Sequence, residues 1–171
     1  MTKRLKILEN SLVKKDRALS DKFENHFIDV KSANGQPLND KRNGQATLGR
    51  WGRQNESIRS AIDGVEITKA AIEREKSKIN YVEFWYKKMP EYLTDLIDNG
   101  EINQWRKHPR MMFVSGVDKA RLVFNDETGL VNHRYVSDIK DKQQFAIFRD
   151  LFNQINKIQN NITASQEAKS Q

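Results

Sequence analysis

The sequence of 171 residues contains no cysteine, and this absence excludes several kinds of site together. A chain without thiols has no disulfides, no thiolate ligands for a metal ion and no cysteine nucleophile. A cytoplasmic location is the expectation that goes with a chain of this kind.

Long apolar stretches are missing as well. No segment approaches the roughly 20 apolar residues that a membrane-spanning helix needs. Near the N-terminus, Lys and Arg are followed by more charge rather than by the apolar segment of about 7–15 residues that a signal peptide has. Hydrophobic residues make up 37% of the sequence and charged residues 31%. We therefore expect much exposed surface and no membrane partner.

The residue patterns of common active sites are also absent. The three histidines, His26, His108 and His133, lie far apart and lack the close spacing of a zinc motif. There is no glycine-rich phosphate loop, no nucleophile elbow and no paired-carboxylate pattern. We predict a protein that is not an enzyme and that has no metal ion, no cofactor and no small-molecule substrate.

A heptad pattern dominates the first half of the sequence. One apolar residue recurs at every seventh position, which predicts a long helix with a single packing seam. That helix should end near Lys88, because Met89 precedes Pro90 and proline disfavours helix in the residue before it. The six residues of the stripe are Trp51, Ile58, Val65, Ile72, Ile79 and Tyr86.

An upstream helix, expected from about Lys3 to Val30, repeats the same spacing with Leu5, Leu12 and Leu19. Phe23 and Phe27 extend its predicted apolar face. The segment at 31–44 contains two Asn-Gly turn signals and one proline, so it is predicted to connect the two helices. Together the helices predict a long antiparallel, coiled-coil-like hairpin.

Polar residues interrupt both halves of the predicted seam. Lys15 and Lys22 take seam positions in the first helix, and Gln54, Thr68 and Glu75 do so in the second. Two interpretations follow: a hairpin of modest stability, or a seam that a partner completes.

Beyond Pro90 the pattern changes to short elements. A short helix at 91–100 is followed by three predicted strands at 110–116, 119–126 and 130–136, and then by an amphipathic helix. The predicted fold class is α+β, in which the helical hairpin precedes a small three-stranded antiparallel sheet flanked by helices. The predicted domains are a hairpin arm at 1–88, a small α-β-β-β-α unit at 89–161 and a flexible tail at 162–171.

The formal net charge of +7 is unevenly distributed. Residues 1–89 hold 19 Lys and Arg against 12 Asp and Glu, whereas residues 90–171 hold 11 of each. A local basic excess is the electrostatic pattern of a protein that binds nucleic acid or another polyanion. The alternative interpretation is that long solvated helices simply carry many charges.

A basic cluster falls at the predicted tip of the hairpin. Lys41, Arg42, Arg50 and Arg53 alternate with glycine and polar residues, and Arg59 continues the surface. Arg and Lys neutralise phosphates, and glycine lets a ligand approach the backbone closely. Trp51 has two interpretations, a base-stacking residue or a residue of the hairpin core. The glycines are equally compatible with tight contact between the helices.

A second cluster, Arg106, Lys107 and Arg110, surrounds His108 immediately after Trp105. These residues are candidates for a phosphate or single-strand contact. The competing interpretation is that Trp105 packs under the small sheet while the cations face solvent.

The function predicted from these features is non-enzymatic binding of nucleic acid, DNA or RNA, through the basic arm. Such a protein would suit an accessory role in a phage or a plasmid. The alternative is a protein-interaction module, in which exposed seam residues bind a partner protein or make the chain self-associate.

Overall fold

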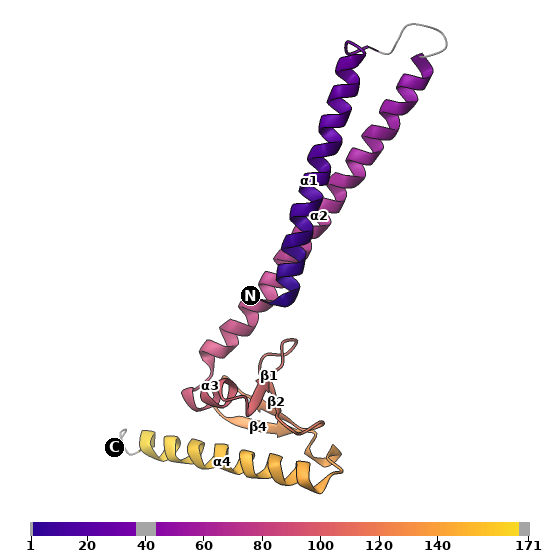
Figure 1. The fold of residues 1–171 in the computed structure, drawn as a ribbon. Helices are drawn as coiled ribbons and strands as arrows, with labels where there is room; N and C mark the ends of the chain where they lie inside the picture. Colours follow the sequence, from indigo (N-terminus) through magenta and orange to yellow (C-terminus); the bar gives the residue numbers. More distant parts are fainter. Residues whose placement is uncertain (1, 37–43, 168–171) are drawn as a thin grey trace. The chain divides into compact units, whose positions relative to one another are not determined.

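The computed structural model describes residues 2–36 and 44–167, which form α-helices and one antiparallel sheet (Figure 1). The chain divides into two compact units, Met1–Ser77 and Lys78–Gln171, which are called the first and second unit below. The division falls within α2, before the arm boundary expected at residue 88. In chain order the elements are α1 (Lys3–Ser32), α2 (Gly44–Lys88), α3 (Glu91–Asp98), β1 (Ile102–Gln104), β2 (Met111–Val114), β3 (Arg121–Phe124), β4 (Val131–Arg134), the short 3-10 helix η1 (Val136–Asp138) and α4 (Lys142–Glu167).

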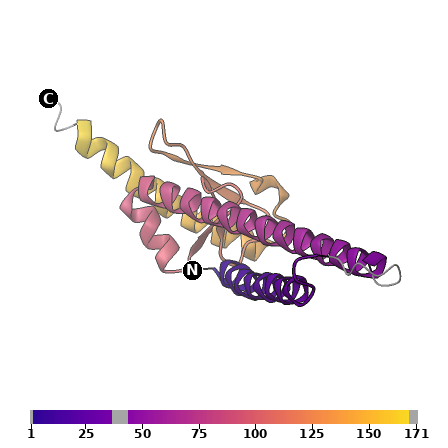
Figure 2. The same ribbon diagram turned by 90° about the horizontal axis from the view of Figure 1, so that it is seen from above.

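In the first unit, α1 and the first part of α2 lie side by side in both views (Figures 1 and 2). Thr2 caps α1 by accepting a hydrogen bond from the Leu5 N–H at 3.2 Å, and its hydroxyl donates to Glu75 Oε1 at 3.1 Å. Farther along α1, Asp29 pairs with Arg50. The start of α1 therefore contacts a late residue of α2, and the end of α1 contacts an early one. This order of contacts is that of antiparallel helices.

The heptad stripe is the buried face of α2 in this unit. Ile58, Val65 and Ile72 are each at most 7% exposed, as is Leu5 on α1. The predicted apolar face of α1 is wrong at its C-terminal end. Phe23 is 38% exposed and Phe27 66% exposed, while the His26 side chain reaches Gln54 instead.

The second unit contains a four-stranded antiparallel sheet in the order β1-β2-β3-β4. The prediction of three strands is therefore wrong by one. The missed strand, β1, has only three residues and buries only Ile102. Such a short segment carries too little alternation to be distinguished from a loop in the sequence.

Alternate residues of the sheet form the core of the second unit together with α3 and α4. Met112 and Leu122 are fully buried, as are Leu93 on α3 and Ile155 on α4. After α3 the chain turns at Gly100, whose φ of +75° favours glycine, as expected for the Asn99-Gly100 pair. The mixed α and β composition predicted from the sequence is confirmed.

Two further predictions concern the ends and the environment of the chain. α4 continues to Glu167, so it overlaps most of the segment at 162–171 that was expected to be a tail. Among residues 2–36 and 44–167, no helix combines the length and the apolar character that crossing a bilayer requires.

Substitution of Leu122 tests the core of the second unit. Leu122→Ala should lower the free energy of unfolding by about 3 kcal/mol, because it leaves a cavity at a fully buried site. Urea denaturation followed by circular dichroism measures this loss. Ile147→Ala is the matched control, since Ile147 is 47% exposed and should change stability little. Equal losses for the two variants would contradict the assigned core.

Candidate nucleic-acid interface

The sequence-predicted cations at the start of α2 differ in what they contact. Lys41 and Arg42 lie outside the described residues. The Arg50 Nε donates to Asp29 Oδ2 at 2.7 Å, and Gln54 Nε2 donates to the same oxygen at 3.1 Å. The Arg50 side chain is 51% exposed and that of Asp29 only 19%. Arg50 thus links α2 to α1, and its charge is largely neutralised.

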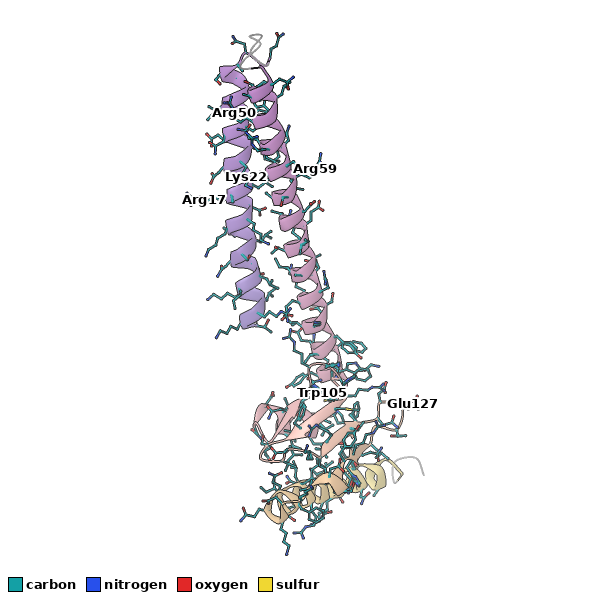
Figure 3. The ribbon with its side chains drawn as sticks, turned by 90° about the vertical axis from the view of Figure 1, so that its right-hand side faces the viewer. Arg17, Lys22, Arg50, Arg59, Trp105 and Glu127 are labelled. Carbon is teal, nitrogen blue, oxygen red and sulfur yellow. The ribbon has the colours of Figure 1, made fainter. Side chains whose placement is uncertain are left out.

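Arg53 and Arg59 are exposed, and neither forms an ion pair with any residue that the structure describes. Arg59 lies on the side of α2 away from α1 (Figure 3). Both guanidinium groups are therefore accessible to an anionic ligand. They are the two predicted site residues of the first unit whose geometry best fits a phosphate contact.

Trp51 is half-buried in the heptad stripe, and its indole Nε1 is buried without a hydrogen-bond partner among the described atoms. A base-stacking side chain would need an exposed ring face. The placement of Trp51 favours a role in the seam.

Lysines that fall in the seam are used internally. Lys15 Nζ donates to the Gly64 carbonyl at 3.0 Å and to Thr68 Oγ1 at 2.7 Å. Lys22 Nζ bonds in the same way to the Ser57 carbonyl and hydroxyl. These two ammonium groups satisfy polar atoms of α2, so they are poor candidates for binding a ligand.

A basic stripe on α1 was not predicted from the sequence. Lys3, Lys6, Lys14 and Arg17 are exposed, and Arg17 lies on the side of α1 away from α2 (Figure 3). Lys3 and Lys14 are eleven residues apart, as are Lys6 and Arg17, which is close to three helical turns. Asp21 follows Arg17 on the same face of α1, and its negative charge ends the stripe.

The signal for this stripe is present in the sequence. Lys3 and Lys14 are each two residues from a seam leucine, Leu5 or Leu12, which places them about 200° around the helix from it. We call Lys3, Lys6, Lys14 and Arg17 the α1 stripe below.

In the second unit, the Arg110 side chain contacts other residues of the protein and has mainly a structural role. Its guanidinium lies 4.9 Å from the ring centroid of Trp85, and its Nη1 donates to Asp126 Oδ1 at 3.1 Å. Lys88 also contacts the Trp85 ring and lies 3.8 Å from Asp126 Oδ2. Arg110 and Lys88 therefore share one carboxylate and cover one indole, which satisfies much of their positive charge.

Trp105 is not packed under the sheet. It is half-buried, and its ring lies 5.5 Å from that of Phe113 and 4.7 Å from that of His108, both in edge contacts. Arg106 and Lys107 are exposed in the loop between β1 and β2. This arrangement leaves a second aromatic and basic surface, separate in sequence from the arm.

Phe113 is covered by Arg121, whose guanidinium carbon lies 3.9 Å from the ring centroid. Burial lowers the pKa of Arg121 below its ordinary value, and the nearby Asp118 charge partly offsets this effect. The guanidinium stays protonated at neutral pH, because arginine is not deprotonated in proteins.

Across residues 2–36 and 44–167, no three His, Asp or Glu side chains gather as they would around a metal ion. Comparison with protein-family models, with curated proteins and with solved structures finds no match to this chain.

A double-mutant cycle tests the Asp29–Arg50 contact. Asp29→Ala and Arg50→Ala should each lower the thermal midpoint, and their coupling should be about 0.5–1 kcal/mol, the upper range for a partly exposed ion pair. Thermal unfolding followed by circular dichroism provides the measurement. Pairing Arg50→Ala with Asp21→Ala instead should give no coupling. A coupling of zero for Asp29 and Arg50 would show that Arg50 is free to bind a ligand.

Proposed function

We propose that this protein is a non-enzymatic nucleic-acid-binding accessory protein. In this proposal, α1 and residues 44–77 of α2 form a coiled-coil-like hairpin arm that contacts phosphates. The observation that carries the proposal is the presence of exposed cations without ion-pair partners among the described residues of the first unit. Among them are the α1 stripe, Arg53 and Arg59.

The physical basis is neutralisation of phosphate charge. Each cation that meets a phosphate releases condensed counterions, so affinity falls steeply as salt rises. Unpaired cations suit this role, because no internal carboxylate competes with the phosphate. Lys41 and Arg42 belong to the same proposal through their place in the sequence, and Arg50 contributes less because Asp29 holds it.

A mobility-shift salt series tests the arm. The double variant Lys14→Glu/Arg17→Glu should weaken binding to duplex DNA and reduce the slope of log K against log salt by about 2, because two phosphate contacts are lost. Arg53→Glu/Arg59→Glu should act similarly.

The matched control is Lys140→Glu/Lys142→Glu, which reverses two exposed cations of the second unit. If the control weakens binding as much as the arm variants do, the arm is not the phosphate-binding surface. If the unmodified protein binds neither duplex nor single-stranded DNA or RNA at low salt, the proposed function is wrong.

A second candidate function, interaction with a protein or with another copy of this chain, is favoured by the apolar side chains exposed on α1. Val13 is 68% exposed, Phe27 66% and Ile28 60%. Exposed apolar residues on a helix are typical of sites that bind a partner helix.

Light scattering tests this alternative for self-association. A dimer built on these side chains should have about twice the mass of one chain, and Phe27→Ser/Ile28→Ser should return it to the monomer mass because apolar burial is lost. Ile147→Ser, an exposed position in the second unit, is the control and should leave the mass unchanged. A monomer at every concentration argues against self-association.

A further inference from the structure

α4 covers one face of the sheet of the second unit, and on the opposite face Tyr81, near the end of α2, lines a hollow. α4 runs along the face that carries the buried residues Met112, Leu122 and Phe124 (Figure 1). Residues of the opposite face alternate with these along the strands, and none of them is fully buried. We call this opposite face the open face.

Strand register places the open-face residues in two rows. The first row crosses all four strands through the pairs Asn103–Phe113, Phe113–Arg121 and Arg121–Arg134. The second row contains Met111, Val123 and Asn132 by the same registers. Trp105, one residue beyond β1, joins this row because its N–H donates to the Met111 carbonyl at 2.8 Å. With strands about 4.8 Å apart, each row extends roughly 14 Å.

Aromatic and guanidinium planes form the surface of the open face. Trp105 contacts Phe113 edge to face, and the Arg121 guanidinium lies over Phe113. Arg121 Nη1 is held by the Ala120 carbonyl at 2.8 Å and the Asp118 carbonyl at 3.0 Å. The guanidinium is thus fixed, with one plane on Phe113. A nucleobase stacks on either an aromatic ring or an arginine plane.

A hollow of about 520 Å³ adjoins the second row. Met111, Val123, Asn132 and Arg134 line it from the sheet. His108 lines it from the loop after β1, and Tyr81 lines it from the end of α2. Asn side chains hydrogen-bond base edges, and Arg neutralises phosphates. Glu127 is an acidic residue at the rim, whereas the eight open-face residues include two arginines and no carboxylate. The charge and the polar lining fit an anionic ligand with planar bases.

We propose that the open face binds single-stranded nucleic acid, with bases stacked on Trp105 and Arg121 and with Arg134 on a phosphate. This inference rests on the proposed function and adds to it the kind of strand that the protein recognises. Duplex is disfavoured at this site, because paired bases present edges rather than free ring faces to a flat sheet.

Fluorescence anisotropy with a labelled twelve-nucleotide oligothymidylate tests the site on the full chain, with a twelve-base-pair duplex as the comparison probe. Trp105→Leu keeps an apolar side chain but removes the stacking plane. It should weaken binding to the oligothymidylate by about tenfold, the contribution of one stacked base. Arg134→Gln should weaken it several-fold, most strongly at low salt. Duplex binding through the arm should be nearly unchanged in both variants.

The matched controls are Phe145→Leu and Arg149→Gln, an exposed aromatic residue and an exposed arginine on α4. Both should bind the oligothymidylate as the unmodified protein does. Circular dichroism and the thermal midpoint verify that each variant is folded. Arg134 is exposed, so Arg134→Gln keeps the test valid even if Trp105→Leu unfolds the sheet.

Different outcomes identify which proposal fails. If the unmodified protein binds neither probe at low salt, both the proposed function and this inference are wrong. If it binds, but Trp105→Leu and Arg134→Gln match the α4 controls, the open face is not the site and only this inference is overturned. Equal losses for oligothymidylate and duplex would also overturn it, since stacking on unpaired bases would then not explain the effect.

Discussion

A shortage of apolar side chains constrains every part of this structure. With 37% hydrophobic residues, the chain buries one stripe of α2 and one face of the sheet. Burial of apolar area contributes about 25 cal/mol per Å², so the apolar residues are most effective when they are concentrated in a few contiguous contacts. In the second unit this concentration lies between the sheet and α4, where Leu122 and Ile155 are completely buried. The opposite face of the sheet then consists of half-buried and polar side chains.

The same shortage gives the first unit a polar seam. Between the buried residues Ile58, Val65 and Ile72, the contacts from α1 are made by Lys15 and Lys22, whose ammonium groups bond to α2 carbonyl and hydroxyl oxygens. Polar groups in a helical seam lower stability but specify register, because each donor on one helix must meet its acceptor on the other. These hydrogen bonds also divide the cations of the arm into two groups. Those that satisfy the seam or pair with Asp29 are structural, and the exposed remainder defines the surface that an anion can reach.

The periodic features of the fold were predictable, and the features that depend on partners were not. Seven-residue spacing located both long helices, because a repeat sustained over many turns is difficult to produce otherwise. The position of Phe23 and Phe27 was mispredicted because they fit the helical period, and only the partner helix shows that His26 occupies the seam at that level. Arg50 was selected for its charge, but its neutralisation by Asp29 depends on the interhelical register. The open face required strand pairing, since Trp105, Arg121 and Arg134 are unrelated in sequence spacing.

Charge and stacking contribute different kinds of recognition. Phosphate neutralisation is indifferent to base sequence and is available from single-stranded and double-stranded nucleic acid alike. Stacking on Trp105 or Arg121 requires a free ring face, which paired bases do not offer. All of the basic excess lies in residues 1–89, whereas these stacking planes lie in the second unit. In the proposed function, net charge indicates where affinity for a polyanion would come from. The proposed preference for one type of strand would depend instead on a small half-buried surface that hardly alters the charge. In a chain of this composition, the sheet face that the apolar residues leave uncovered is the stronger candidate for selectivity.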